Sequence, residues 1–117
     1  MKTSTPERIR ELTDAGLWGD KTLCDYLRIQ ANNHPTMLAA ADQHTREHLT
    51  SSPPLRLTFL ELDNGSDALA IDLLQRGVAC GDRVMLQMPN VVDLIVLYYA
   101  PSQPGAIAHP IPVQYGP

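Results

Sequence analysis

Hydrophobic and polar positions in residues 1–35 follow a spacing that predicts two short helices. The first is expected to begin after Thr5, which can cap the first helical turn, and to stop at Gly16. The second follows Thr22 and Asp25, whose spacing resembles a capping box, and its apolar residues recur at helical spacing until an Asn-His-Pro sequence. We therefore expect a helical lead-in over residues 1–35.

Beyond this lead-in the pattern changes to two short apolar runs around a polar stretch. The runs at 37–41 and 55–58 have the length of strands, although the first is rich in alanine. The stretch 42–54 is polar and ends in Ser-Ser-Pro-Pro, so it is predicted to be an exposed loop. Thr58 and Glu61 form a further capping box, which predicts that a helix starts directly after the second run.

The rest of the chain alternates between helical and strand-like segments. The helix that follows the second run is expected to end at Gly77, and a turn then leads into a strand at 83–88 with apolar residues at every second position. An apolar helix capped by Asn90 follows, and 106–111 is predicted to be another strand. This order is typical of an α/β fold, here a partial parallel sheet with flanking helices.

Composition and charge narrow the class of protein. The 117 residues suffice for one modest domain, and the formal net charge of -4 gives no reason to expect nucleic acid as a partner. Residues 1–7 lack the apolar core of a secretory signal, so we expect a cytoplasmic chain. The apolar run 91–100 contains Asp93 and is much shorter than the roughly 20 residues that cross a bilayer, so no membrane span is expected.

Few residues of the sequence are candidates for catalysis or metal binding. Cys24 and Cys80 lie far apart without Cys-x-x-Cys spacing, so both are expected to be free, buried thiols. His44, Glu47 and His48 spell the inverted signature of zinc peptidases, which needs a helix to bring the two imidazoles to the same side. The nearby Ser-Ser-Pro-Pro and the lack of an apolar stripe favour a solvated loop, which leaves a zinc hydrolase as a remote alternative.

Four blocks of sequence resemble, in order and with compatible gaps, the start of acyl-CoA synthetases of the AMP-forming ligase superfamily. Residues 57–62 are similar to the family's Thr-Tyr-x-Glu-Leu element, and residues 73–84 to its Gly-Val-x-x-Gly-Asp-x-Val turn. Residues 86–90 resemble its strand followed by Leu-Pro-Asn, and residues 100–111 its Ala-x-x-x-x-Gly-Ala strand ending in proline. The segment 15–25 is also similar to synthetases that act on fatty or alicyclic acids.

The resemblance implies a two-step reaction, in which ATP and Mg²⁺ convert a carboxylic acid to an acyl-adenylate and coenzyme A then displaces AMP. It also implies that the family's phosphate loop, its nucleotide-binding stretches and its C-terminal lysine would follow position 117. Residues 1–117 would then be an incomplete N-terminal part of an AMP-binding domain. We expect no catalytic, cofactor-binding or metal-binding residue in this chain, no cofactor bound by it alone, and no activity without the groups that surround the phosphates.

Two prolines depart from the family pattern. Pro101 falls where the family's helix would continue, and a proline within a helix costs about 3 kcal/mol, while Pro104 precedes Gly105. These departures suggest a truncated gene or a decayed copy of the enzyme. The alternative is a non-catalytic interaction module that pairs with a separately encoded remainder. Both hypotheses leave a sheet edge unpaired, so exposed apolar surface and self-association are expected.

Overall fold

Five helices and four short strands make up the part of the chain that the structure describes. The structure is a computed structural model and describes residues 4–114. In chain order the elements are α1 (Pro6–Asp14), α2 (Leu23–Asn33), β1 (Leu38–Ala41), α3 (Glu47–Thr50), β2 (Arg56–Thr58), α4 (Phe59–Gln75), β3 (Arg83–Leu86), α5 (Val92–Ser102) and β4 (Ile107–Pro110). The mixed helix and strand content confirms the predicted α/β class.

Side-chain caps fix where three of the helices begin, as the sequence predicts. At the start of α4, Thr58 Oγ1 accepts a hydrogen bond from Glu61 N at 3.2 Å, and Glu61 Oε2 accepts one from Thr58 N at 2.8 Å. Thr22 and Asp25 form the same reciprocal pair at the start of α2, and the Thr5 side chain caps α1. The amide groups of the first helical turn have no acceptor within the helix. The side-chain oxygens of these capping residues accept their hydrogen bonds instead.

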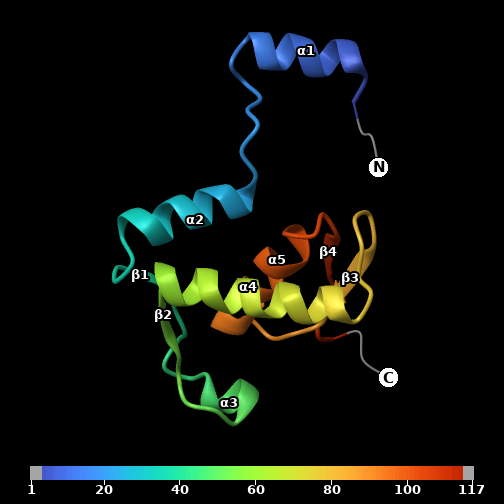
Figure 1. Cartoon of the computed structure of the whole chain (residues 1–117). Coiled ribbons are helices and arrows are strands. Elements are labelled where there is room, and N and C mark those ends of the chain that lie inside the picture. Colours follow the sequence, from blue (N-terminus) through green and yellow to red (C-terminus); the bar gives the residue numbers. More distant parts are fainter. Residues whose placement is uncertain (1–3, 115–117) are drawn as a thin grey trace.

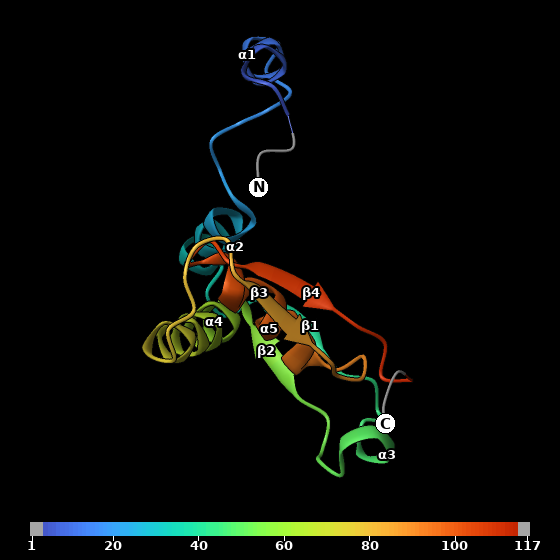
Figure 2. The same ribbon diagram turned by 90° about the vertical axis from the view of Figure 1, so that its right-hand side faces the viewer.

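The strands form two separate two-stranded sheets. β3 and β4 are parallel, with Val84 opposite Ala108 and Leu86 opposite Pro110, and α5 makes the crossover between them. This confirms the predicted strand, helix, strand unit, in which the helix covers one face of the sheet (Figure 2). β2, however, pairs antiparallel with β1 and not with β3. The connection through residues 42–55 contains only the four-residue helix α3, which makes no crossover, and β1 and β2 run in opposite directions.

The core lies where α4 packs against α5 and α2. Small side chains bring these helices close together, because Ser66 of α4 and Ala100 of α5 are both fully buried. Ser66 Oγ satisfies its polar group within its own helix, donating to Leu62 O at 2.7 Å. The first helix, α1, stands apart from this core at the end of an extended stretch and has no buried residue (Figure 1).

The α5 helix departs from the sequence prediction at its C-terminal end. It continues through Pro101 to Ser102, so this proline does not interrupt the helix despite the cost expected from the sequence. Pro101 lies in the last turn, where its ring is fully buried and its carbonyl accepts a hydrogen bond from Ala106 N at 3.0 Å. Burial of the ring and this bond offset the donor that proline lacks.

One face of the β3–β4 sheet is open. Met85 is 69% exposed and Ile107 is 39% exposed, whereas Leu86 is buried on the face that α5 covers. The exposed apolar surface expected from the sequence is therefore present here. Among residues 4–114, no helix combines the length and the hydropathy that crossing a membrane requires.

Candidate functional site

An apolar groove lies at the carboxyl ends of the two parallel strands, which is where open α/β sheets usually bind ligands. We call it the carboxyl-end groove. Its volume is about 480 Å³ and its walls include Leu86 of β3, Leu94 and Tyr98 of α5, and Ile111 after β4. None of the described residues that line it is charged. The groove therefore offers apolar contact and lacks the cations that would hold a polyphosphate.

Arg28, which lines a polar cavity, is already paired with carboxylates. Arg28 of α2 reaches Asp67 at 2.5 Å and Asp63 at 3.4 Å, both on α4, and it lines a cavity of about 350 Å³ together with Cys24 and Gln103. Two carboxylates thus face a single guanidinium group. This arrangement joins α2 to α4 and leaves no net positive charge for an anionic ligand.

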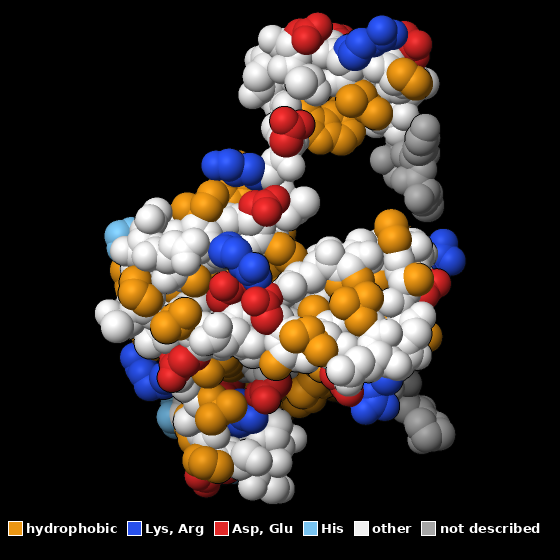
Figure 3. Space-filling model, viewed as in Figure 1, with side chains coloured by type: hydrophobic (Ala, Val, Ile, Leu, Met, Phe, Trp, Pro, Cys, Tyr) orange, Lys and Arg blue, Asp and Glu red, His pale blue; other side chains and the backbone are white. Residues whose placement is uncertain are grey.

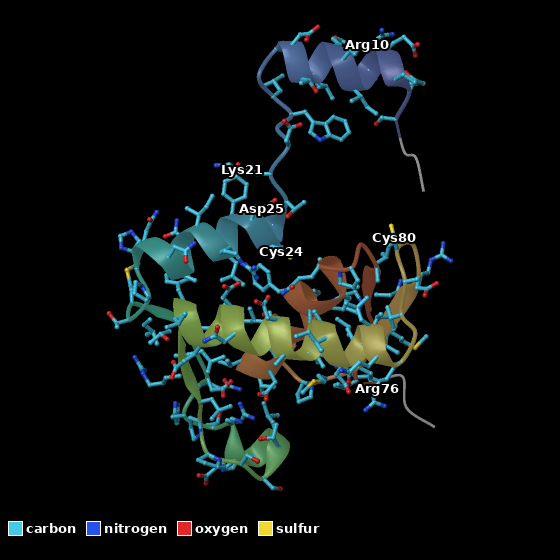
Figure 4. The ribbon with its side chains drawn as sticks, viewed as in Figure 1. Arg10, Lys21, Cys24, Asp25, Arg76 and Cys80 are labelled. Atoms are coloured by element: carbon cyan, nitrogen blue, oxygen red, sulfur yellow. The ribbon has the colours of Figure 1, made fainter. Side chains whose placement is uncertain are left out.

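The two cysteines lie in different surroundings and are both free (Figure 4). Cys24 is half-buried, its Sγ donates to Tyr99 O at 3.5 Å, and burial together with the neighbouring Asp25 raises the pKa of its thiol. Cys80 is exposed, so the expectation that both thiols are buried is wrong for this residue. It lies in the turn before β3, where the backbone folds tightly and covers the side chain little.

An ionic cluster, in which the side chains of Asp42 and Arg46 are buried and that of Asp93 is partly exposed, ties the segment after β1 to the start of α5. The Asp42 carboxylate, 1% exposed, accepts hydrogen bonds from Val92 N at 2.7 Å and from Leu55 N at 2.9 Å. It also pairs with Arg46, whose Nη1 lies 2.7 Å from Asp93 Oδ2. We call Asp42, Arg46 and Asp93 the Asp42 cluster. It supplies the cap that the sequence analysis assigned to Asn90, because the cap position of α5 is Val91, which has no side-chain hydrogen bond.

The structure gives no support to the zinc alternative. The α3 helix begins at Glu47 and has only four residues, so His44 lies in the preceding turn and does not share a helix with His48. Within residues 4–114, no group of three or more potential ligands is placed to hold a metal ion. The predicted loop at 42–54 does contain exposed residues, but Arg46 at its centre is buried.

The Asp42 cluster is the main feature that the sequence analysis missed. A local signal exists, since Asp42 follows an apolar run and Arg46 lies four positions later, where helical side chains pair. That signal alone also fits a solvated ion pair. Burial and the contact with α5 come only from the tertiary structure.

Comparison with known proteins places this arrangement in a family. The model of the family described as AMP-binding enzyme matches residues 28–117. A medium-chain fatty-acid–CoA ligase of Escherichia coli (strain K12) is 30% identical over 109 residues, which are 93% of this chain and 18% of that protein. A salicyl-AMP ligase / salicyl-S-ArCP synthetase of Mycobacterium tuberculosis is 35% identical over 101 residues, which are 86% of this chain and 17% of that protein.

Solved structures agree with the sequence relatives. The apo structure of Mycobacterium smegmatis MbtA matches with a TM-score of 0.77 and 29% identity, over 92% of this chain and 19% of that one. The inhibitor-bound N-terminal domain of FACL13 from Mycobacterium tuberculosis matches with a TM-score of 0.68 and 30% identity, over 82% of this chain and 22% of that one. The chain thus spans less than a fifth of the length of the two curated relatives above. By its sequence and its fold, the chain belongs to the family of AMP-binding enzymes, which includes acyl-CoA ligases and other adenylate-forming ligases.

Proposed function

We propose that this chain is framework of an enzyme that activates a carboxylic acid with ATP and Mg²⁺ to an acyl-adenylate and transfers the acyl group to coenzyme A. The observation that carries the proposal is the match of the family model to residues 28–117 together with the shared fold. Residues 1–117 would form an N-terminal part of the AMP-binding domain, with no catalytic or cofactor-binding residue of their own. Such an enzyme would act in the cytoplasm.

The distribution of charge supports a framework role. Phosphoryl chemistry depends on cations and hydrogen-bond donors positioned around the phosphates. No described residue that lines the carboxyl-end groove is charged. Arg46 is held by buried and partly buried carboxylates, and Arg8, Arg10, Arg28 and Arg76 each lie within ion-pair distance of a carboxylate. On this proposal, the residues that bind ATP come from other parts of the enzyme.

A segment exchange tests the proposal. The matching 109-residue stretch of the Escherichia coli ligase would be replaced by the corresponding part of this chain, and acyl-CoA formation measured with the parent enzyme's own acid. We expect the chimera to keep the parent's choice of acid, whereas an otherwise identical enzyme lacking the stretch should be inactive. A chimera that folds but forms no acyl-adenylate would contradict the framework role.

A pyrophosphate-exchange assay on the isolated chain tests the expected inactivity. We expect no exchange of labelled pyrophosphate into ATP by the purified 117 residues. Exchange above the level of a heat-treated sample would overturn this part of the proposal, because the chain would then hold ATP by itself. The alternative of an interaction module predicts activity only after mixing with a second polypeptide, and no described feature favours it.

A further inference from the structure

The Asp42 carboxylate meets donors from three parts of the chain. Arg46 precedes α3, Leu55 precedes β2, and Val92 is the first residue of α5. A main-chain hydrogen bond from Asp42 N to Leu55 O, 2.9 Å long, fixes the orientation from which the side chain reaches the helix. One side chain therefore sets the relative position of segments that are 13 and 50 residues away.

The bonds from Val92 and Arg46 matter because these two donors are shielded from water. Val92 is 2% exposed and Arg46 is 6% exposed, so each loses hydration when the chain folds and needs a protein acceptor. The positive end of the α5 dipole also favours a negative charge at this position. The cluster holds two carboxylates and one guanidinium group, and Asp93 extends it into the first turn of α5.

The first turn of α5 also shapes the carboxyl-end groove. Leu94 lines that groove, and its amide bonds to Val91 O at 3.0 Å, one residue before Val92. A shift of Val92 would therefore move a wall of the groove. In contrast, the pairing of β3 with β4 has its own backbone hydrogen bonds, such as those from Ile107 N to Asp82 O and from Ile111 N to Leu86 O, in which Asp42 takes no part.

We propose that Asp42 is a positioning residue, which holds the start of α5 against the β1–β2 side of the molecule and so sets one wall of the carboxyl-end groove. Removal of its carboxylate frees residues 42–55 and the first turn of α5 together, while α4 and the β3–β4 pairing persist. The inference rests on the geometry of the cluster and is independent of the reaction that the complete enzyme catalyses. Its failure would leave the proposed function standing.

Hydrogen exchange of the full chain, followed residue by residue, tests this inference. In Asp42→Ala we expect the amide of Val92 to exchange at least about tenfold faster, because a buried donor loses its acceptor. The amide of Leu55, a residue that is 38% exposed, should also exchange faster, but by a smaller factor. The amide of Ile107, which bonds to Asp82 O at 2.7 Å in the β3–β4 unit, should keep its wild-type rate. Asp42→Asn keeps an acceptor oxygen but loses the charge that pairs with Arg46, so an intermediate effect is expected.

Asp72→Asn is the matched control. Asp72 also pairs with an arginine four positions later, Arg76, at 2.7 Å, but this pair is largely exposed. Its substitution should leave the Val92 and Leu55 amides unchanged. Unchanged protection of Val92 in Asp42→Ala, or equal acceleration at Val92 and Ile107, would overturn the inference. If Asp42→Ala fails to fold, the same comparison in Asp42→Asn decides the question.

Discussion

Gly105 lies so close to Cys80 that a Cβ atom added to the glycine would be 2.9 Å from the cysteine Sγ. The two turns that flank the β3–β4 unit meet at this point, where Gly81 N donates to Gly105 O at 2.9 Å. Gly105 also has a φ of +80°, a backbone conformation that residues with a Cβ rarely adopt. The positive φ and the contact with Cys80 are thus two separate reasons that favour glycine here.

Substitution of Gly105 by alanine should therefore cost more than a backbone effect alone. Gly77→Ala is the control, since its φ is +90° but nothing lies within 4 Å of the added Cβ, and it should cost about 1–2 kcal/mol of unfolding free energy. Gly105→Ala should exceed that value. The excess should shrink in a Cys80→Ala background, as measured by a double-mutant cycle in urea. Equal costs for the two glycine substitutions would contradict the packing argument.

The Asp42 cluster predicts that the free energy of unfolding decreases as the pH is lowered. Burial would raise the pKa of the Asp42 carboxyl, but hydrogen bonds from Arg46, Leu55 and Val92 outweigh it and hold the pKa below the ordinary 3.8. The unfolded chain then binds this proton more readily than the folded chain. The stabilisation is present above the ordinary pKa and is lost as the pH falls through the lower, folded value.

Urea unfolding at successively lower pH checks this dependence. Asp42→Asn cannot titrate at this position, so its unfolding free energy should fall less steeply than that of the wild type as the pH decreases. The charged groups that face Asp42 are Arg46, which stays positive, and Asp93, which faces it across that arginine. Asp25 and Glu61, whose pKa values are lowered by hydrogen bonds from Thr22 and Thr58, contribute an acid dependence that both proteins share. Parallel curves would argue against the role of Asp42.

The caps of α4 and α1 offer a comparison between a helix in the core and one outside it. Thr58→Ala removes the acceptor for Glu61 N and should lower the unfolding free energy by about 1 kcal/mol. Thr5→Ala removes the equivalent bond to Arg8 N, yet α1 has no buried residue, so the main unfolding transition should not move. Circular dichroism should report a small loss of helix in Thr5→Ala. A similar shift of the transition in both variants would show that α1 is coupled to the core.

The open face of the β3–β4 sheet predicts self-association of the isolated chain. Parallel sheets are normally covered on both faces, and here Met85 and Ile107 remain exposed. Hydrophobic side chains also come to the surface over the part of the molecule that holds α4, α5, β3 and β4 (Figure 3). Met85→Lys should reduce the weight-average mass in sedimentation, because it removes an exposed apolar side chain from this face and adds a charge to that of Arg83, which lies on the same face. Met37→Lys, at a side chain 56% exposed outside this sheet, should have little effect. A wild-type chain that stays monomeric at high concentration would contradict this prediction.

Local chemistry was sufficient to predict most of the elements. The capping box of Thr58 and Glu61 places the start of α4 correctly, because the acceptor and the donor lie three residues apart and need no distant partner. The glycines at 16 and 77 end helices through their positive φ values. The parallel pairing of β3 and β4 follows from the helix that separates them, although the sequence did not reveal that β2 pairs with β1.

What the sequence determined by itself is therefore the set of elements and, through four short blocks, the family. Only the tertiary structure decided that Asp42 caps α5, because a carboxylate chooses its partner among donors that folding brings near, and Val92 is 50 positions away. The tertiary structure also decided that α5 continues through Pro101, because burial of the ring offsets the free-energy cost of a proline within a helix. A hydrogen bond between residues three positions apart can be predicted from the sequence. Burial depends on segments that come together only in the folded molecule.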